Sequence, residues 1–282
     1  MPERQIYLFD ETCFKCSEII TKQYSTSFSI GIRAFNKRFR YPIYAIYGFV
    51  RYADEIVDTL HGHNQRQLLA DFKQNTFEAI RNGVSLNPVL QAFQLVVNSY
   101  GIEHNLVDQF LCSMGKDLDR KTYDAQAYRE YIYGSAETVG LMCLRVFCGA
   151  DGQLYCQLLP YACRLGAAFQ KVNFLRDIKS DMDERGRVYF PGVDFKNFTL
   201  ANKQLIEADI ENDFDHALQG IRQLPEGAGM GVYIAYVYYR RLFEKIRKLP
   251  PAALLQKRIR INNGMKIMLY AKAALRHRLN KL

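Results

Sequence analysis

The amino-acid sequence predicts an all-α fold in a single domain spanning residues 1–282. Apolar residues recur three and four positions apart along most of the chain, which is the spacing of one helix face. No segment shows a convincing alternation of apolar and polar residues, the pattern of a half-buried strand. Glycines, prolines and capping residues separate the periodic segments. We therefore expect several helices, each with an apolar face, around a shared core.

The first half of the chain is expected to begin with two helices and a break. A helix over residues 13–35 breaks near Ser25 to Ser29, where hydroxyl side chains gather. Pro42 then opens a long helix over residues 42–61, because proline is favoured in a first helical turn. Three further helices are expected over residues 66–83, 87–101 and 103–123, and glycine ends the first two of them.

The second half is expected to contain longer helices and one extended loop. Thr199 is a plausible N-cap, and residues 183–199 have the Gly and Pro content of a loop. Pro160 is expected near the start of its helix or at a kink. The predicted helices cover residues 125–148, 154–186, 200–224, 229–248 and 262–281.

Positive charge is concentrated at the C-terminus. The net charge is +9, and the segment from Lys245 onward holds eleven Lys or Arg residues and no Asp or Glu, which leaves 27 basic and 29 acidic residues elsewhere. Such a segment fits a solvated helix face, or an anionic partner such as lipid headgroups or a phosphorylated ligand. It contains no recognisable nucleic-acid motif, so nucleic acid is not an expected partner.

Cysteine content and the N-terminus predict a cytoplasmic protein. The seven cysteines are odd in number and scattered, and the polar start lacks the apolar core of a signal peptide. Cys13 and Cys16 form a pair without a second pair at zinc spacing, so we interpret them as half-buried helix residues. No stretch reaches the ~18 apolar residues of a membrane span. Any membrane contact is therefore expected to be peripheral, at the inner surface.

The segment RYADEIVD, residues 51–58, places two like charges on one helix face. Asp54 and Asp58 are four residues apart, and such a pair on a helix repels by roughly 0.2–0.5 kcal/mol. A second helix carries a similar column, because Gln170, Asn173, Asp177 and Asp181 follow one another at spacings of three and four. Both columns of short oxygen-bearing side chains interrupt otherwise apolar helices.

Magnesium resolves the repulsion within such columns. Mg²⁺ takes hard oxygen ligands and is usually held by one or two carboxylates together with substrate phosphates. Asp and Asn side chains are short, so two facing columns leave room for a diphosphate bridged by metal ions. One Asp-x-x-x-Asp alone is more simply a solvated face with ion pairs. Two columns, each accompanied by cationic or aromatic residues suited to phosphate, favour a diphosphate site; these residues are Tyr47, Arg51, Lys171 and Arg176.

Four segments of the sequence resemble the squalene/phytoene synthase family of trans-isoprenyl diphosphate synthases. The first, YSTSFSIGIRAF followed by YPIYAIYGFVRYADEIVD, is similar to the family's Ser-rich helix break and first aspartate-rich motif. The second, QKVNFLRDIKSDMDERGRVYFP, is similar to the signature around the second aspartate-rich motif. YIYGSAETVGLM and, more loosely, AYVYYRRLFEKIRK also match. Together they span about residues 20 to 250, and the likeness is greatest to bacterial phytoene synthases.

The resemblance implies an isoprenoid synthase fold with a central cavity, and a head-to-head condensation of two identical prenyl diphosphates. It implies Mg²⁺ as the cofactor, with Mn²⁺ as a substitute. One diphosphate leaves, the second molecule's double bond attacks the allylic cation, and a cyclopropylcarbinyl diphosphate forms. Rearrangement and proton loss then give the linear product. Phytoene synthases use geranylgeranyl diphosphate and need no NADPH, whereas squalene synthases use farnesyl diphosphate with NADPH.

The resemblance also assigns roles to individual residues. The implied metal ligands are Asp54, Asp58, Asn173, Asp177 and Asp181, of which the four aspartates are also catalytic. The implied substrate-binding residues are Tyr24, Ser25, Thr26, Ser27, Tyr47, Arg51, Gln170, Asn173, Arg176 and Tyr239. Tyr133, as a catalytic residue, and Phe28 are candidates to steady a carbocation through the ring quadrupole, with core packing as the alternative.

Three features depart from the family pattern. Glu55 replaces a frequent Asp in the first motif, on a different helix face from Asp54. Tyr24 and Thr26 stand where some relatives carry His and Lys. Residues 260–266 lack the dense basic cluster common at that position, which weakens the expectation of a diphosphate contact there.

The expected function is that of a phytoene synthase, a geranylgeranyl transferase of carotenoid biosynthesis. One alternative is a squalene or dehydrosqualene synthase acting on farnesyl diphosphate. Another is a noncatalytic relative that serves as a binding or assembly protein. Retention of all four motif aspartates argues against the noncatalytic alternative. The sequence leaves substrate chain length and oligomeric state open.

Overall fold

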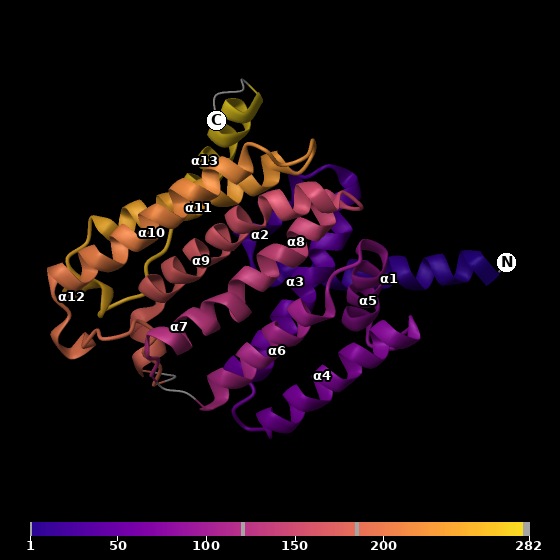
Figure 1. The fold of residues 1–282 in the computed structure, drawn as a ribbon, viewed down its shortest axis with the longest axis horizontal. Coiled ribbons are helices and arrows are strands. Elements are labelled where there is room, and N and C mark those ends of the chain that lie inside the picture. Colours follow the sequence, from indigo (N-terminus) through magenta and orange to yellow (C-terminus); the bar gives the residue numbers. More distant parts are fainter. Residues whose placement is uncertain (1, 120–121, 184–185, 279–282) are drawn as a thin grey trace.

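The computed structural model describes residues 2–119, 122–183 and 186–278. Within these ranges the chain is helical, and the only β-type pairing is an isolated parallel bridge between Thr122 and Val188. The predicted all-α fold is confirmed. Helix α9, Gly152–Asp183, packs against α8 on one side and α10 and α11 on the other (Figure 1).

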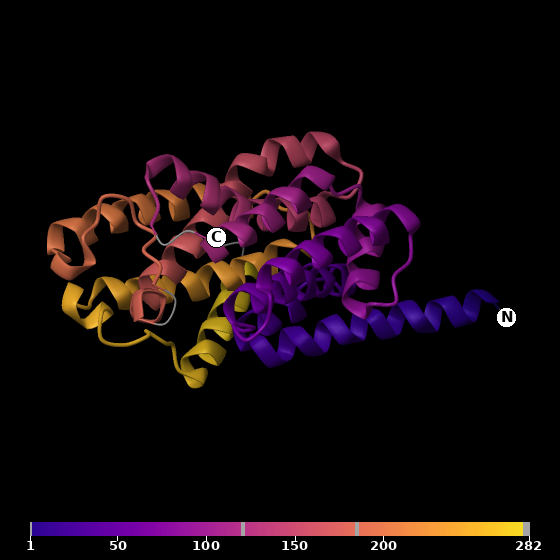
Figure 2. The ribbon, with the colours of Figure 1, turned by 90° about the horizontal axis from the view of Figure 1, so that it is seen from below.

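The predicted break in the first helix is confirmed. Helix α1 covers Pro2–Tyr24 and α2 covers Thr26–Arg33. Ser25 between them is extended, with φ −145° and ψ 103°, and its side chain accepts a hydrogen bond from the Phe28 amide. Helix α1 begins eleven residues before the predicted start at Cys13. Its N-terminal part extends beyond the other helices in both views (Figures 1 and 2).

The predicted position of Pro42 at a helix start is wrong. Helix α3 runs over Lys37–Asp58, because the Asn36 side chain accepts a hydrogen bond from the Arg38 amide and caps the helix five residues earlier. Pro42 therefore lies inside α3, where its missing N–H leaves the Arg38 carbonyl without the usual helical partner.

The next three helices follow the sequence pattern closely. Gly83 and Gly101 both adopt the left-handed conformation that ends a helix, with φ of 69° and 61°. Asn87 caps the helix that Pro88 opens. These helices are α4 Gln65–Asn82, α5 Pro88–Tyr100 and α6 His104–Asp119.

The single helix predicted over residues 125–148 contains a π-helical turn. It consists of α7 Ala125–Ile132, the π-helical turn Tyr133–Glu137 and α8 Thr138–Cys148. A π-turn inserts one residue into the helical repeat, so side chains on either side of it change face. Gly134 permits close approach of α6 at this point, because a Cβ there would lie 1.8 Å from the Ser113 hydroxyl oxygen.

The C-terminal third contains the predicted helices and two short elements that were not predicted, a 3₁₀ turn and the helix α12. Pro160 lies within α9, and Thr199 forms a capping box with Asn202, as a capping residue should. The short α12 was not predicted, and residues 279–281 of the last predicted helix lie outside the described residues. The observed elements are the 3₁₀ turn Phe195–Asn197, α10 Leu200–Ile221, α11 Gly229–Arg247, α12 Pro251–Leu254 and α13 Asn263–Arg278.

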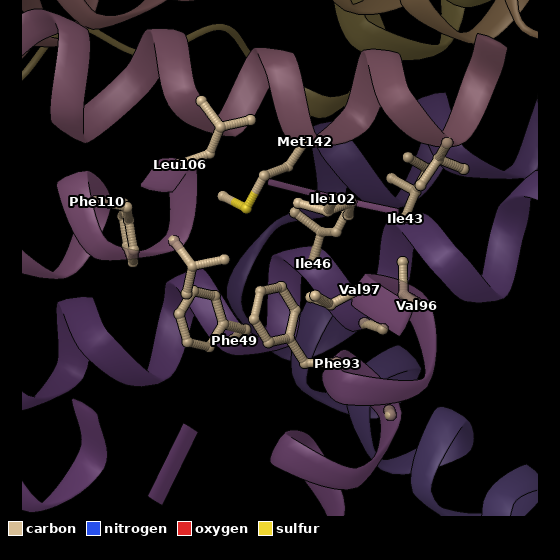
Figure 3. Close-up of a cluster of buried hydrophobic side chains, with 14 of the residues drawn as sticks. Ile43, Ile46, Phe49, Phe93, Val96, Val97, Ile102, Leu106, Phe110 and Met142 are labelled. Atoms are coloured by element: carbon tan, nitrogen blue, oxygen red, sulfur yellow. The ribbon is translucent and has the colours of Figure 1, made fainter. Parts of the chain in front are cut away.

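Two clusters of buried side chains hold the helices together. In the first, the Phe49 and Phe93 rings stack with centroids 3.8 Å apart, and Phe110 lies 5.5 Å from Phe49 (Figure 3). The second is rich in tyrosine, and Phe174 stacks on Tyr189 at 4.0 Å. Helix α9 contributes buried residues to both clusters, and the other helices contribute to one cluster or the other. The two clusters can therefore fix two walls of a space between them.

Close contact at Gly166 makes a first prediction. A Cβ there would lie 2.7 Å from the Ala136 carbonyl oxygen, which is backbone and cannot swing aside. We expect Gly166→Ala to lower the free energy of unfolding by about 1–3 kcal/mol through overpacking, although alanine has the higher helix propensity. Gly152→Ala in the same helix is the control, because nothing lies within 4 Å of its Cβ position. Urea denaturation measures both, and a Gly166 variant as resistant as the control would contradict the prediction.

Candidate active site

A cavity of about 680 Å³ lies among the helices, with residues of both core clusters in its walls. Most of its lining comes from α2, α3, the π-turn with α8, α9, α10 and α11, and a few residues of α1, α6, α7 and the loops complete it. Charged side chains gather where α3 and α9 end. The opposite end, beside the start of α3, is lined by apolar side chains such as Ile43 and Ile46.

Both oxygen-bearing columns line this cavity. Helix α3 contributes Asp54 and Asp58, and α9 contributes Asn173, Asp177 and Asp181. All five proposed metal ligands therefore face one space from two helices that are distant in sequence.

Arg187 connects the two columns. Its amide donates a hydrogen bond to the Asp181 carbonyl oxygen at 2.7 Å, and its guanidinium lies 3.0 Å from an Asp58 carboxylate oxygen. Only 7% of the Arg187 side chain is exposed. A buried arginine thus holds the acidic ends of α3 and α9 in a fixed relation.

Arginines accompany the other acids as well. Arg51 Nη1 lies 3.9 Å from Asp54 Oδ2, and Arg51 also pairs with Glu55, which keeps Glu55 off the column. Asp177 accepts from Arg176 Nε at 3.0 Å and pairs with Arg258 Nε at 2.8 Å. These guanidinium groups balance the carboxylates and supply the bidentate donors that a diphosphate needs.

Burial, together with a neighbouring carboxylate, raises the pKa of Asp54 to about 7. Burial is the main cause and the Asp58 carboxylate the next, while Arg51 partly counteracts both. Burial likewise raises the pKa of Asp117 to about 6, against the opposing influence of Arg187 and the Tyr131 hydroxyl. Both shifts favour the protonated form of these two carboxyl groups.

The donor set fits a hard divalent cation completed by other ligands. Within the described ranges, no group of three acidic, histidine or cysteine side chains converges closely enough to bind a metal unaided. Mg²⁺ does not need one, since it commonly takes one or two carboxylates and fills its octahedron with water and phosphate oxygens. Two carboxylates on α3 and an amide with two carboxylates on α9 meet that requirement.

The predicted substrate-binding residues mostly line the cavity. Tyr239 donates to Asn173 Oδ1 at 3.3 Å and stacks on Phe169 at 3.9 Å, and Phe28 lies 5.7 Å from the Tyr47 ring. The predicted residues that line the cavity are Tyr24, Ser25, Ser27, Phe28, Tyr47, Arg51, Gln170, Asn173, Arg176 and Tyr239.

Three predicted residues lie elsewhere. Thr26 is exposed, and its hydroxyl accepts from Lys266 at 2.9 Å. Tyr133 packs against the first core cluster, because the π-turn that begins at this residue changes the helix face that meets the cavity. Lys171 points toward α10, where its ammonium group pairs with Asp209 at 2.5 Å and Asp213 at 2.7 Å.

The structure adds residues that the sequence did not single out. Tyr131, two positions before Tyr133, lines the cavity, and its hydroxyl donates to Asp117 Oδ2 at 2.6 Å. Tyr123 donates to the other oxygen of Asp117 at 3.1 Å. Asp117 could have been found from the sequence, because it is an acidic residue on the otherwise apolar, buried face of α6. Arg187 and Arg258 come from loops, where helical periodicity gives no signal.

The squalene/phytoene synthase family model matches residues 21–264 of the chain. The chain belongs to the squalene/phytoene synthase family. This family assignment makes the protein a prenyltransferase-type enzyme, and the matched range includes both columns.

Several phytoene synthases are similar in sequence. The chain is 30% identical to the phytoene synthase of Cereibacter sphaeroides, over 83% of this chain and 71% of that protein. It is 28% identical to the 15-cis-phytoene synthase of Synechocystis, over 84% and 77% respectively. Identity to the chloroplastic phytoene synthase 1 of Solanum lycopersicum is 25%, and the match spans 62% of that longer protein.

Solved structures share the fold. A dehydrosqualene synthase with a bound ligand superposes with a TM-score of 0.82 at 22% identity, covering 97% of this chain and 98% of that one. The squalene synthase HpnC of Alicyclobacillus acidocaldarius gives 0.73 at 19% identity, covering 85% and 94%. The expected isoprenoid synthase fold is confirmed. None of the helices in the described part of the chain combines the length and apolarity needed to cross a bilayer.

The raised pKa of Asp54 makes a second prediction. Its carboxyl ionises near pH 4 when unfolded and near 7 when folded, so the folded state binds the extra proton between these values. The contribution of Asp54 to the free energy of unfolding therefore falls as pH rises from 4 to 7. Without divalent metal, Asp54→Asn should raise the free energy of unfolding at pH 8, by roughly 1–2 kcal/mol after screening by cavity water, and by little at pH 4.

Asp108→Asn is a control for which the change in the free energy of unfolding should have the opposite sign. Its hydrogen bond with Lys73 lowers the pKa of Asp108, so this carboxylate contributes stability at neutral pH that is lost on acidification. Chemical denaturation of both variants at pH 4 and pH 8 makes the comparison. An Asp54→Asn protein less stable than wild type at pH 8 would show that the acids do not crowd one another.

Proposed function

We propose that the protein is a phytoene synthase, which condenses two geranylgeranyl diphosphates head to head. The main observation that supports this proposal is the cavity itself. It has the two oxygen-bearing columns at one end and a long apolar chamber at the other. A diphosphate requires the first feature and an isoprenoid chain requires the second.

In this proposal Asp54 and Asp58 hold metal from α3, and Asn173, Asp177 and Asp181 hold it from α9. Bound Mg²⁺, or Mn²⁺ in its place, supplies Lewis acidity toward the departing diphosphate. Arg51, Arg176 and Arg258 donate hydrogen bonds to diphosphate oxygens in the same region. Arg187 keeps the two helix ends at the spacing that one ligand can bridge.

Aromatic and apolar side chains then govern the carbocation. Phe28, Tyr47 and Tyr239 form an aromatic group next to the acids, with ring centroids 5.7 and 6.1 Å from Phe28, and ring faces attract positive charge. Tyr131 keeps its proton at Oη, directed to Asp117, so its oxygen has a fixed position at the polar end. The apolar walls exclude water, which would hydrolyse an allylic cation.

The length of the cavity supports a long prenyl substrate. Lining residues on α3 run from Asp58 to Ile43, fifteen positions, or about 22 Å at 1.5 Å per residue. This is comparable to an extended geranylgeranyl chain. Sequence relatives named phytoene synthase support the same substrate. The likeness to a dehydrosqualene synthase structure makes farnesyl diphosphate the competing substrate.

Product analysis makes a third prediction. Purified protein with Mg²⁺ and geranylgeranyl diphosphate should yield phytoene, with equal amounts in the presence and absence of NADPH. Lipid extracts resolved by chromatography and mass spectrometry identify the hydrocarbon. A C30 product from farnesyl diphosphate, with none from the C20 substrate, would overturn the proposal in favour of a squalene or dehydrosqualene synthase.

Removal of one carboxylate from the column on α9 makes a fourth prediction. Asp177→Asn keeps the shape but removes a charge that binds the metal–diphosphate group, so kcat should fall on the order of 10²–10³-fold. Circular dichroism should show unchanged helix content. Asp209→Asn is the matched control, since Asp209 pairs with Lys171 away from the cavity, and its kcat should change less than threefold. Unimpaired turnover in Asp177→Asn would refute the assignment of the second column.

A further inference from the structure

The end of the cavity opposite the acids is closed by aromatic rings. Phe35 lies just before the Asn36 cap of α3, and Phe147 lies in the last turn of α8. Both line the cavity, and only 6% and 7% of their surfaces are exposed. Their ring centroids are 5.1 Å apart. Together they form a pair of rings across the far end, which we call the end wall.

The direction of the helices places the end wall far from the metal ligands. Helix α3 runs from Phe35 toward Asp58, and α9 runs from Leu158, another lining residue at the far end, to Asp181. Leu224, three residues after the end of α10, also lines the cavity. Gln157 and Gln223, which neighbour Leu158 and Leu224 in the sequence, share a hydrogen bond of 2.7 Å at the exposed surface. Among the described residues of α3 and α8, no lining residue lies farther from the acids than Phe35 and Phe147.

The end wall is held rigidly in place. A Cβ at Gly231 would lie 2.4 Å from two ring carbons of Phe35, so this ring packs directly on the α11 backbone. Phe147 is supported from behind by Phe39, whose ring meets it edge-on at 5.5 Å. Phe39 is itself buried but does not line the cavity. Each wall ring is therefore backed on the side away from the cavity, Phe35 by the α11 backbone and Phe147 by Phe39.

We propose that Phe35 and Phe147 determine the maximum length of the prenyl chain that the enzyme accepts. This inference rests on the proposed function, because a prenyl tail must extend from the acids along the chamber. A chain that is bound by its diphosphate at one end reaches the wall with its last isoprene unit. Excess length meets two buried rings that cannot yield, whereas a shorter chain leaves the apolar end unfilled.

Truncation of Phe147 should lengthen the accepted chain. In Phe147→Leu and Phe147→Ala, the space up to Phe39 becomes available to substrate. We expect the ratio of kcat/KM for the diphosphate one isoprene unit longer than the preferred substrate, relative to the preferred one, to rise at least tenfold. The hydrocarbon product should gain two isoprene units, one from each substrate molecule. Phe93→Leu removes a buried ring that stacks on Phe49 and does not line the cavity, so this control should leave the ratio within twofold of wild type.

The opposite change should shorten the accepted chain. Cys143 lines the cavity one helical turn nearer the acids than Phe147. Cys143→Phe places a new ring at that level, so activity should shift at least tenfold toward the diphosphate one unit shorter. Of these variants, Phe147→Leu is the mildest and is expected to fold, and its thermal unfolding can verify this.

The outcomes separate this inference from the proposed function. The preferred substrate of the wild type decides between geranylgeranyl and farnesyl diphosphate, whatever the variants do. The wall is tested by the change in chain length relative to that substrate. An unchanged ratio in Phe147→Leu, or an equal change in Phe93→Leu, would overturn the end wall even if phytoene is the product.

Discussion

The structure depends on a pair of carboxylate columns that face each other across one cavity. Asp54 and Asp58 on α3 meet Asp177 and Asp181 on α9, and Asp117 adds a further acid from α6. Such a cluster opposes folding, as the raised pKa of Asp54 records. Residues held in unfavourable surroundings persist where the rest of the fold over-determines them. Under the proposed function the cost is tolerated because the same cluster attracts metal-bound diphosphate.

The remainder of the fold keeps the columns in place. The first core anchors α3 through the Phe49–Phe93 stack, and the second anchors α9 through Phe174 and Tyr189. Gly166 allows α9 to approach the π-turn closely, which sets one cavity wall. Arg187 then joins the acidic ends of the two helices. The proposed metal ligation, substrate length and water exclusion therefore rely on helix packing at points distant from the acids.

The sequence predicts the fold class and both columns, because each is encoded within a single helix. Four-residue spacing places Asp54 beside Asp58 and Asp177 beside Asp181 whatever surrounds them. It also predicts the break at Ser25, since a serine cap is a local signal. Helical spacing cannot reveal the π-turn, which depends on contact between Gly134 and Ser113 of another helix. The resemblance implied Tyr133, whereas the structure brings Tyr131 to the cavity and packs Tyr133 against the first core cluster.

Residues outside regular helices also escape sequence reasoning. Arg187 and Arg258 reach the acids from loops, so their positions depend on how the chain returns to the site. The direction of Lys171 is decided by Asp209 and Asp213 on α10, a helix that only tertiary packing brings near. Local periodicity thus predicts which side chains share a helix face, and packing decides which face meets the cavity.

Anomalous diffraction from crystals soaked with Mn²⁺ and inorganic diphosphate tests the central claim most directly. Mn²⁺ scatters anomalously and accepts the oxygen ligands that suit Mg²⁺. The account predicts manganese peaks within about 2.0–2.3 Å of carboxylate oxygens from both α3 and α9, with diphosphate bridging them. Peaks confined to one helix, or located away from Asp54 and Asp177, would contradict it.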